Sequence, residues 1–172
     1  MKFSLSQDFP AGLDRLWEVF GRADYPEQKY RSLGSSDIRV LHFRVGAEVI
    51  EVELERTASV AWEMIPAWAH AFLSRRQVMR HRTRWQRVSP TSVEAELDIA
   101  PVGKRVSAHG AGSIIQLSPD LTRMTLRFTA ESTIPVLGAR AARLYAKQIR
   151  EALRADHEFT LRHLKETACR CA

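Results

Sequence analysis

The chain has 172 residues, with 26 Lys and Arg against 20 Asp and Glu for a formal charge of +6, and 45% of its residues are hydrophobic. This length and balance are typical of one globular domain with its own core, and they exclude disordered and fibrous classes. The two cysteines, Cys169 and Cys171, both lie at the end of the chain. We therefore expect no disulfide framework, and a reducing compartment is the simpler expectation.

Neither a signal peptide nor a membrane span is expected from the hydropathy pattern. The first residues, MKFSLSQDFP, contain no continuous apolar stretch of signal-peptide length. The most apolar segment, residues 58–73, is interrupted by Glu63, Pro66 and His70 and is shorter than the roughly 20 residues of a membrane helix. These features predict a cytoplasmic protein.

The N-terminal part predicts one strand followed by two short helices. Alternating apolar and polar residues over 3–9 indicate a half-buried strand, which residues 10–12 end. Apolar residues at helical spacing over 13–20 predict the first helix. A second helix is expected to begin at Pro26 and to end at Gly34.

Residues 38–44 and 48–55 alternate in hydropathy and predict a hairpin. Placing Val40 opposite Val52 gives one apolar face and one face on which opposite charges meet. Apolar matching and charge complementarity choose the same register, which supports it more than either cue alone.

Two further hairpins are predicted over residues 77–88 with 93–99 and over residues 106–117 with 122–131. In the first of them, arginines alternate along one strand and carboxylates along the other, so an even register sets them opposite each other on one face. These residues are Arg80, Arg82, Arg84, Glu94, Glu96 and Asp98.

A long helix is predicted for the C-terminal part. Apolar residues recur at helical spacing from Leu137 to Leu164, and no proline or glycine follows Gly138 in this run. Pro135 fits the first turn of this helix. The tail over residues 168–172 is expected to fray.

The order of these elements resembles the helix-grip fold of START-like proteins, the superfamily of lipid-transfer domains, polyketide cyclases and the birch-pollen allergen type. The resemblance is closer to a bacterial branch that carries the description domain of unknown function. Four stretches carry it: DYPEQKYRSLG at residues 24–34, the strand that contains Trp85, GAGSIIQLSPDLTRMTLRFTAESTIPVLG at residues 110–138, and HEFTLRHL near the end.

This resemblance implies a single α+β domain over residues 1–172. Its fold would be a seven-stranded curved antiparallel sheet wrapped around a long C-terminal helix, with two short helices after the first strand. It also implies a deep apolar cavity between the sheet and the last helix. Members of the superfamily hold lipids, polyketides, hormones or aromatic metabolites, and a few catalyse cyclisation or dehydration. Likeness of fold does not choose among these functions.

One departure from the family pattern is an apolar insertion at about residues 57–75, in which Pro66 is placed to begin a short helix. The insertion is expected to act as a lid over the cavity or to line it, and a satellite core or a dimer patch is the alternative. Trp62, Trp68 and Phe72 are the residues that would do this.

Two histidines are candidates for contact with a ligand. The predicted register points His42 inward with Arg44 on the same face, and His81 lies on the Trp85 side of its strand. Each can instead be a structural histidine, because buried polar groups usually find partners within the protein. Gly110 and Gly112 are expected on the inner face of their strand, where they would remove bulk beneath the sheet.

Other site classes find little support. An arginine cluster and a sequence pI of about 9.8 invite a nucleic-acid interpretation, but the carboxylates expected opposite the arginines argue against nucleic-acid binding. The cluster consists of Arg75, Arg76, Arg80, Arg82, Arg84 and Arg87. His157 and His163 are spaced so that they point in different directions on a helix, so no metal site is predicted, and no cofactor is expected.

The leading hypothesis is a noncatalytic protein that binds a hydrophobic small molecule or lipid in its cavity. One alternative is an enzyme of cyclase or dehydratase type that uses a cavity histidine. Another is a protein-interaction domain that uses the aromatic insertion. The candidate ligand-binding residues are His42, Arg44, Trp62, Trp68, Phe72, His81, Trp85, Gly110, Gly112, Phe128 and Tyr145.

Overall fold

The computed structural model describes the backbone of residues 1–60 and 62–169 and the side chains as far as residue 166. Within this part of the chain, seven antiparallel strands form one sheet in the order β1-β7-β6-β5-β4-β3-β2. The strands are β1 (Lys2–Phe9), β2 (Ser36–Val45), β3 (Val49–Ser59), β4 (Arg76–Ser89), β5 (Ser92–Pro101), β6 (Val106–Ser118) and β7 (Leu121–Ser132). The helices are α1 (Leu13–Phe20), α2 (Tyr25–Ser32) and α3 (Gly138–Cys169).

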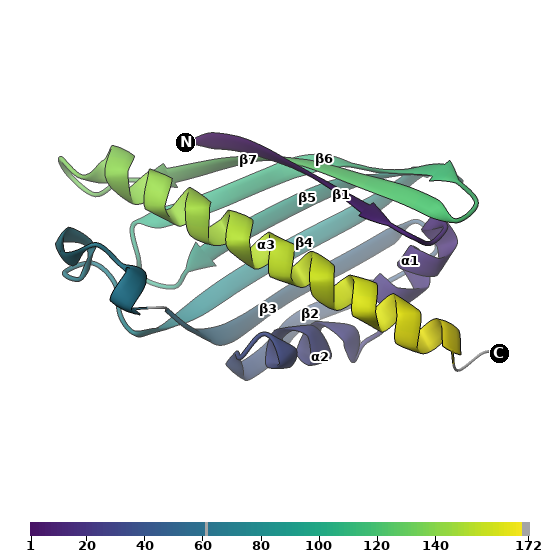
Figure 1. Ribbon diagram of the computed structural model, residues 1–172, viewed down its shortest axis with the longest axis horizontal. Coiled ribbons are helices and arrows are strands. Elements are labelled where there is room, and N and C mark those ends of the chain that lie inside the picture. The colour runs from purple at the N-terminus through teal and green to yellow at the C-terminus, as the bar shows by residue number, and fades with distance from the viewer. Residues whose placement is uncertain (61, 170–172) are drawn as a thin grey trace.

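The long helix α3 crosses one face of the curved sheet, as Figure 1 shows, while α1 and α2 lie toward its C-terminal end. The segment between β3 and β4 lies toward the N-terminal end of α3 and contains two short 3-10 helices, η1 (Trp62–Met64) and η2 (Ala67–Ala69). The predicted α+β helix-grip architecture is confirmed.

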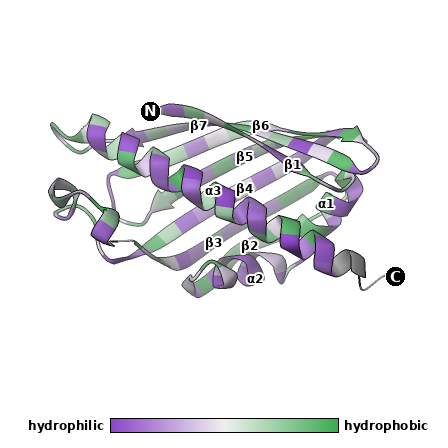
Figure 2. Ribbon diagram, viewed as in Figure 1, coloured by the Kyte–Doolittle hydropathy of each residue, from purple (hydrophilic) through white to green (hydrophobic). Residues whose placement is uncertain are grey.

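Alternation along the strands builds the inner face of the sheet. In β5, buried Val93, Ala95 and Ile99 alternate with exposed Glu94 and Asp98. Figure 2 shows the same alternation as changes of colour along the strands. Because successive side chains of a strand point to opposite faces, one face receives the apolar residues and packs against α3.

The core consists of two clusters rather than one. The first gathers α1, α2 and the adjoining ends of β1, β3, β5 and β6 around residues such as Phe9, Leu16 and Ile50. The second joins β6 and β7 to the N-terminal half of α3 around Phe128 and Ile149. The space between the two clusters is where the main cavity lies.

The predicted register of the first hairpin is wrong. Val40 pairs with Leu54 rather than with Val52, and a bulge follows, so that Phe43 pairs with Val52. A bulge inserts an extra residue and reverses which side chains face inward beyond it. His42 therefore lies on the outer face.

Two predicted boundaries also change. The helix α3 begins at Gly138, so Pro135 precedes it instead of occupying its first turn. The strand β3 extends to Ser59, so the first part of the predicted insertion is strand, and Pro66 caps the short helix η2 as expected.

The predicted alignment of arginines with carboxylates on β4 and β5 is confirmed at Arg82, which pairs with Asp98. Its nearest carboxylate is nevertheless Glu53 on β3, at 3.3 Å. Arg80 likewise contacts Glu55 on β3. These two arginines on the outer face of β4 are therefore paired with carboxylates of β3, whereas the prediction considered only those of β5.

No helix in the described part of the chain is long and apolar enough to cross a membrane. Of the predicted fraying tail, residues 170–172, which include Cys171, lie outside the described residues.

Candidate functional site

A cavity of about 510 Å³ lies between the inner face of the sheet and α3. Its lining comes from β3, β4, β5 and β7 on the sheet side, from α2 at one end and from α3 above. The volume falls in the range of small-molecule sites, which are mostly apolar and carry a few polar groups that orient the ligand.

Small side chains on both the helix and the sheet side of the cavity leave room for this space. Ala152 and Ala155 line the cavity from α3. Ala58 and Thr83 line it from β3 and β4. Protein interiors pack densely, so we attribute an opening of this size to the small side chains in its wall rather than to loose packing.

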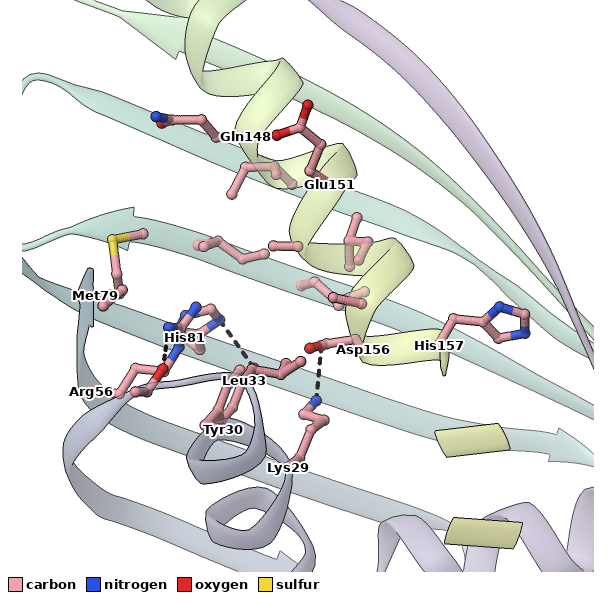
Figure 3. Close-up of a pocket in the computed structure, with 18 of the residues that line it drawn as sticks. Lys29, Tyr30, Leu33, Arg56, Met79, His81, Gln148, Glu151, Asp156 and His157 are labelled. Carbon is pink, nitrogen blue, oxygen red and sulfur yellow. Dashed lines mark hydrogen bonds and ion pairs between the residues drawn. The ribbon is translucent and has the colours of Figure 1, made fainter. Parts of the chain in front are cut away.

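Five polar side chains meet in the cavity wall, and we call them the polar cluster. Figure 3 shows them extending from α2, β3, β4 and α3 toward one another, with dashed lines for the hydrogen bonds and the ion pair among them. The polar cluster consists of Lys29, Tyr30, Arg56, His81 and Asp156.

His81 is the centre of the polar cluster and has both ring nitrogens engaged. Arg56 Nε lies 3.2 Å from Nε2 of His81, and the Tyr30 hydroxyl lies 3.3 Å from Nδ1. A guanidinium can only donate, so Nε2 accepts, and the proton of the neutral ring is on Nδ1. His81 therefore donates from Nδ1 to the Tyr30 oxygen.

The surroundings keep His81 neutral. Burial lowers the pKa of His81 well below its usual value of 6.5, and the positive charges of Arg56 and Lys29 lower it further. Arg56 is held in turn by a hydrogen bond to Ser35 Oγ at 2.7 Å and lies 4.5 Å from the centre of the Tyr30 ring.

The Lys29 ammonium pairs with the Asp156 carboxylate at 3.0 Å and joins α2 to α3 across the cavity wall. Burial lowers the pKa of Lys29, but the charge of Asp156 and the two neighbouring tyrosines outweigh burial and raise it overall. Burial also raises the pKa of Tyr30, so its hydroxyl stays protonated at neutral pH.

Three of the predicted ligand-binding residues line this cavity, namely His81, Trp85 and Tyr145. Trp68 and Phe72 line a second cavity of about 200 Å³ between the insertion and α3. Tyr145 lines both spaces, so the two cavities adjoin.

Six predicted residues lie elsewhere. His42 and Arg44 are exposed on the outer face, each 3.6 Å from Glu51, because the bulge in β2 turns them outward. Trp62 stacks on His70 within the insertion at a ring-centroid distance of 4.3 Å and lines neither cavity.

Gly110, Gly112 and Phe128 are on the inner face as expected, but they do not widen the cavity. A Cβ atom at Gly110 would lie 2.4 Å from the Phe128 ring, which already occupies that space. The Phe128 ring in turn stacks on Phe3 at 5.2 Å within the second core cluster.

The sequence prediction missed Lys29, Tyr30, Arg56 and Asp156. Arg56 could have been found, because it follows Ile50, Val52 and Leu54 at the inner positions of β3, where a charge is unexpected. Asp156 likewise interrupts the apolar stripe of α3. Nothing local marks Lys29 or Tyr30, whose role depends on how α2 packs.

No cluster of three His, Cys, Asp or Glu side chains suited to a metal ion occurs among the residues that the structure describes.

The curved sheet, the long C-terminal helix and the two short helices after β1 define a START-like fold. Within this class, the sequence profile of the family described as Protein of unknown function (DUF2505) matches residues 4–164. The match spans most of the chain, and the chain belongs to this family. A comparison with curated proteins finds no match.

Solved structures with the same fold have distant sequences. TTHA0849 from Thermus thermophilus is 15% identical, with a TM-score of 0.62 over 97% of this chain and 99% of that chain. The Zhui aromatase/cyclase from Streptomyces sp. R1128 is 14% identical, with a TM-score of 0.60 over 98% and 95% of the two chains. A START superfamily protein from Mycobacterium smegmatis is 13% identical, with a TM-score of 0.52 over 95% and 98%. At these identities the likeness shows the fold alone.

Proposed function

We propose that this protein binds a hydrophobic small molecule or lipid, without catalysis, in the cavity between the sheet and α3. The observation that carries the proposal is the cavity of about 510 Å³, whose wall is mainly apolar and carries the polar cluster on one side. Burial of apolar ligand surface supplies about 25 cal/mol per Å² toward affinity, and a single polar cluster can orient one end of a ligand.

An aromatase/cyclase among the structures of similar fold raises an enzymatic alternative. A general acid or base needs a ring nitrogen that can reach the substrate. In the described structure His81 has one ring nitrogen bound to Arg56 and the other to Tyr30. Both ring nitrogens of His81 are thus occupied by contacts within the protein, so His81 is better suited to orient Tyr30 than to transfer protons to or from a substrate. We therefore adopt binding as the function.

The test compares two tryptophan substitutions on the same strand. Thr83→Trp places a large ring on the inner face of β4, where Thr83 lines the cavity. Val78→Trp is the matched control, because Val78 has a similar shape but is 44% exposed and does not line the cavity.

Native mass spectrometry of the purified proteins is expected to find a bound hydrophobic species with the wild type and with Val78→Trp, and none with Thr83→Trp. Thermal shifts of the protein stripped of bound lipid, with decanoate, decanol and naphthoate as probes, are expected to follow the same order. A wild-type protein that retains no such species and is stabilised by none of the probes would contradict the proposed function.

A further inference from the structure

The tyrosines that line the cavity differ in where their hydroxyl protons go. The Thr160 hydroxyl donates to the Asp156 carbonyl at 2.8 Å, so Tyr25, 2.7 Å from Thr160 Oγ1, must be the donor in their contact. Tyr145 donates to the Ile99 carbonyl at 3.0 Å. The protons of Tyr25 and Tyr145 are both used within the protein.

Tyr30 is different because its oxygen receives a hydrogen bond from His81 instead of giving one. His81 donates to it from Nδ1, as the contact of Arg56 with Nε2 requires, and the Lys29 ammonium lies 4.6 Å from the centre of the same ring. Across the described residues, no acceptor receives the proton of Tyr30. A hydroxyl whose oxygen is already engaged by donors directs its own proton to a further group.

Positive side chains outnumber negative ones around the cavity. Lys29 is neutralised by Asp156 at 3.0 Å, and Lys147 lies 4.0 Å from Glu151 on α3. Arg56, which lines the cavity, contacts His81, Ser35 and the Tyr30 ring, and among the described residues it has no carboxylate partner. The wall therefore carries one positive charge that no neighbouring side chain balances.

A second donor in the wall has no acceptor. Trp85 also lines the cavity, and its buried Nε1 has no hydrogen-bond partner within the described structure. Tyr30 and Trp85 thus each leave a donor without an acceptor, in addition to the unbalanced positive charge of Arg56. A buried donor that stays unpaired is costly, so a ligand rich in acceptors is favoured.

We propose that the ligand of this cavity is an amphiphile with a carboxylate head group, which accepts the Tyr30 hydroxyl proton and pairs with the Arg56 guanidinium. A carboxylate is an acceptor without protons of its own, and its single charge matches the single unbalanced cation. The nearby Asp156 carboxylate disfavours a head group with two negative charges. This inference rests on the proposed function and adds to it the chemistry of the ligand.

The test uses two pairs of probes with the same apolar body, decanoate with decanol and naphthoate with naphthylmethanol. Isothermal titration calorimetry at neutral pH measures the ratio of the two dissociation constants in each pair. We expect the wild type to bind at least one acid about ten times more tightly than its alcohol, as is typical of hydrogen bonds to a charged group.

Two variants locate the origin of this preference. Tyr30→Phe removes the free proton and keeps the ring beneath Arg56, and Arg56→Gln removes the charge. Both are expected to bring the acid-to-alcohol ratio close to one while the alcohol still binds. Arg80→Gln is the matched control for the loss of a charge, because Arg80 contacts Glu55 on the outer face of the sheet and does not line the cavity, and it is expected to retain the preference.

The outcomes separate the two proposals. Equal binding of acid and alcohol by the wild type overturns the carboxylate assignment and leaves the proposed function standing. A preference that survives in both Tyr30→Phe and Arg56→Gln overturns the assignment as well. Binding of none of the four probes overturns the proposed function together with the inference. Near-ultraviolet circular dichroism confirms that each variant is folded before its ratio is used.

Discussion

Arg56 donates a hydrogen bond to His81 across 3.2 Å, and this contact makes the cavity histidine a fixed acceptor. A proton on Nε2 of His81 would point at a donor that never loses its charge. The imidazole is thereby held in one tautomer, and the direction of the next hydrogen bond, to Tyr30, follows from it. The Arg56 guanidinium on β3 thus determines which atom donates and which accepts in the contact between His81 and Tyr30.

This relationship predicts how stability depends on pH. The folded pKa of His81 is well below 6.5, so as pH falls the unfolded chain takes up a proton at this residue before the folded protein does. The contribution of His81 to stability is complete above pH 6.5 and is lost as pH falls toward the folded pKa. The slope from one such group is at most about 1.4 kcal/mol per pH unit.

Urea unfolding between about pH 5 and pH 7, where histidine titrates, measures this slope. The His81→Gln variant keeps an acceptor for Arg56 and a donor for Tyr30 but cannot titrate, so its stability is expected to fall less steeply on acidification. His42→Gln is the control, because His42 is exposed on the outer face of β2. Equal slopes for the wild type and His81→Gln would show that His81 is not the titrating group.

The two histidines also show how far the sequence predicts the site. Alternation along β4 correctly placed His81 on the inner face beside Met79 and Trp85. The same reasoning failed for His42, because the bulge in β2 has no clear mark in the sequence and reverses the alternation beyond it. Element order and the regular strands are local properties, whereas a bulge depends on how two strands fit together.

The polar cluster was harder to predict for a related reason. Arg56 and His81 are diagonal neighbours on adjacent strands, because Arg56 pairs with Met79 and His81 with Leu54, so the correct register of β3 and β4 would have brought them together. Lys29 and Asp156 are separated by most of the chain and meet only because α2 packs beside α3. The periodicity of each helix says nothing about such a meeting.

The glycines of β6 yield a prediction about stability. A Cβ atom at Gly112 would lie 1.9 Å from the Thr125 carbonyl oxygen, a backbone atom that cannot move without separating β6 from β7. Gly112→Ala is therefore expected to lower the free energy of unfolding by about 3 kcal/mol, as overpacking does. Gly46→Ala is the control, since the nearest atom to its added Cβ is 3.7 Å away, and it is expected to change stability by less than about 0.5 kcal/mol. Comparable stabilities of the two variants in urea unfolding would contradict this account of Gly112.

The ion pair between Lys29 and Asp156 yields a second stability prediction. Their side chains are only 15% and 22% exposed, so removing one charge leaves the other poorly solvated. Asp156→Asn and Lys29→Met are each expected to cost about 2 kcal/mol, less than for a fully buried pair. The double variant Lys29→Met/Asp156→Asn is expected to cost less than the sum of the single changes, because no charge is left alone. Additive losses in a double-mutant cycle would mean that the two groups are not coupled.

The contacts of His70 lead us to expect that the insertion between β3 and β4 can open without disturbing the sheet. His70 stacks on Trp62 and donates from Nε2 to the Ile65 carbonyl at 3.0 Å, and Ile65 is a buried residue that lines the main cavity. His70→Ala removes both contacts, so the segment is expected to open locally and trypsin is expected to cut faster after Arg75. The cooperative melting of the sheet should remain near that of the wild type, because local opening involves little of the core.

His109→Ala, which removes an exposed histidine from β6, is the control and should leave the rate of cleavage unchanged. Unaltered cleavage of His70→Ala, followed by mass spectrometry of the fragments, would show that other contacts hold the insertion closed.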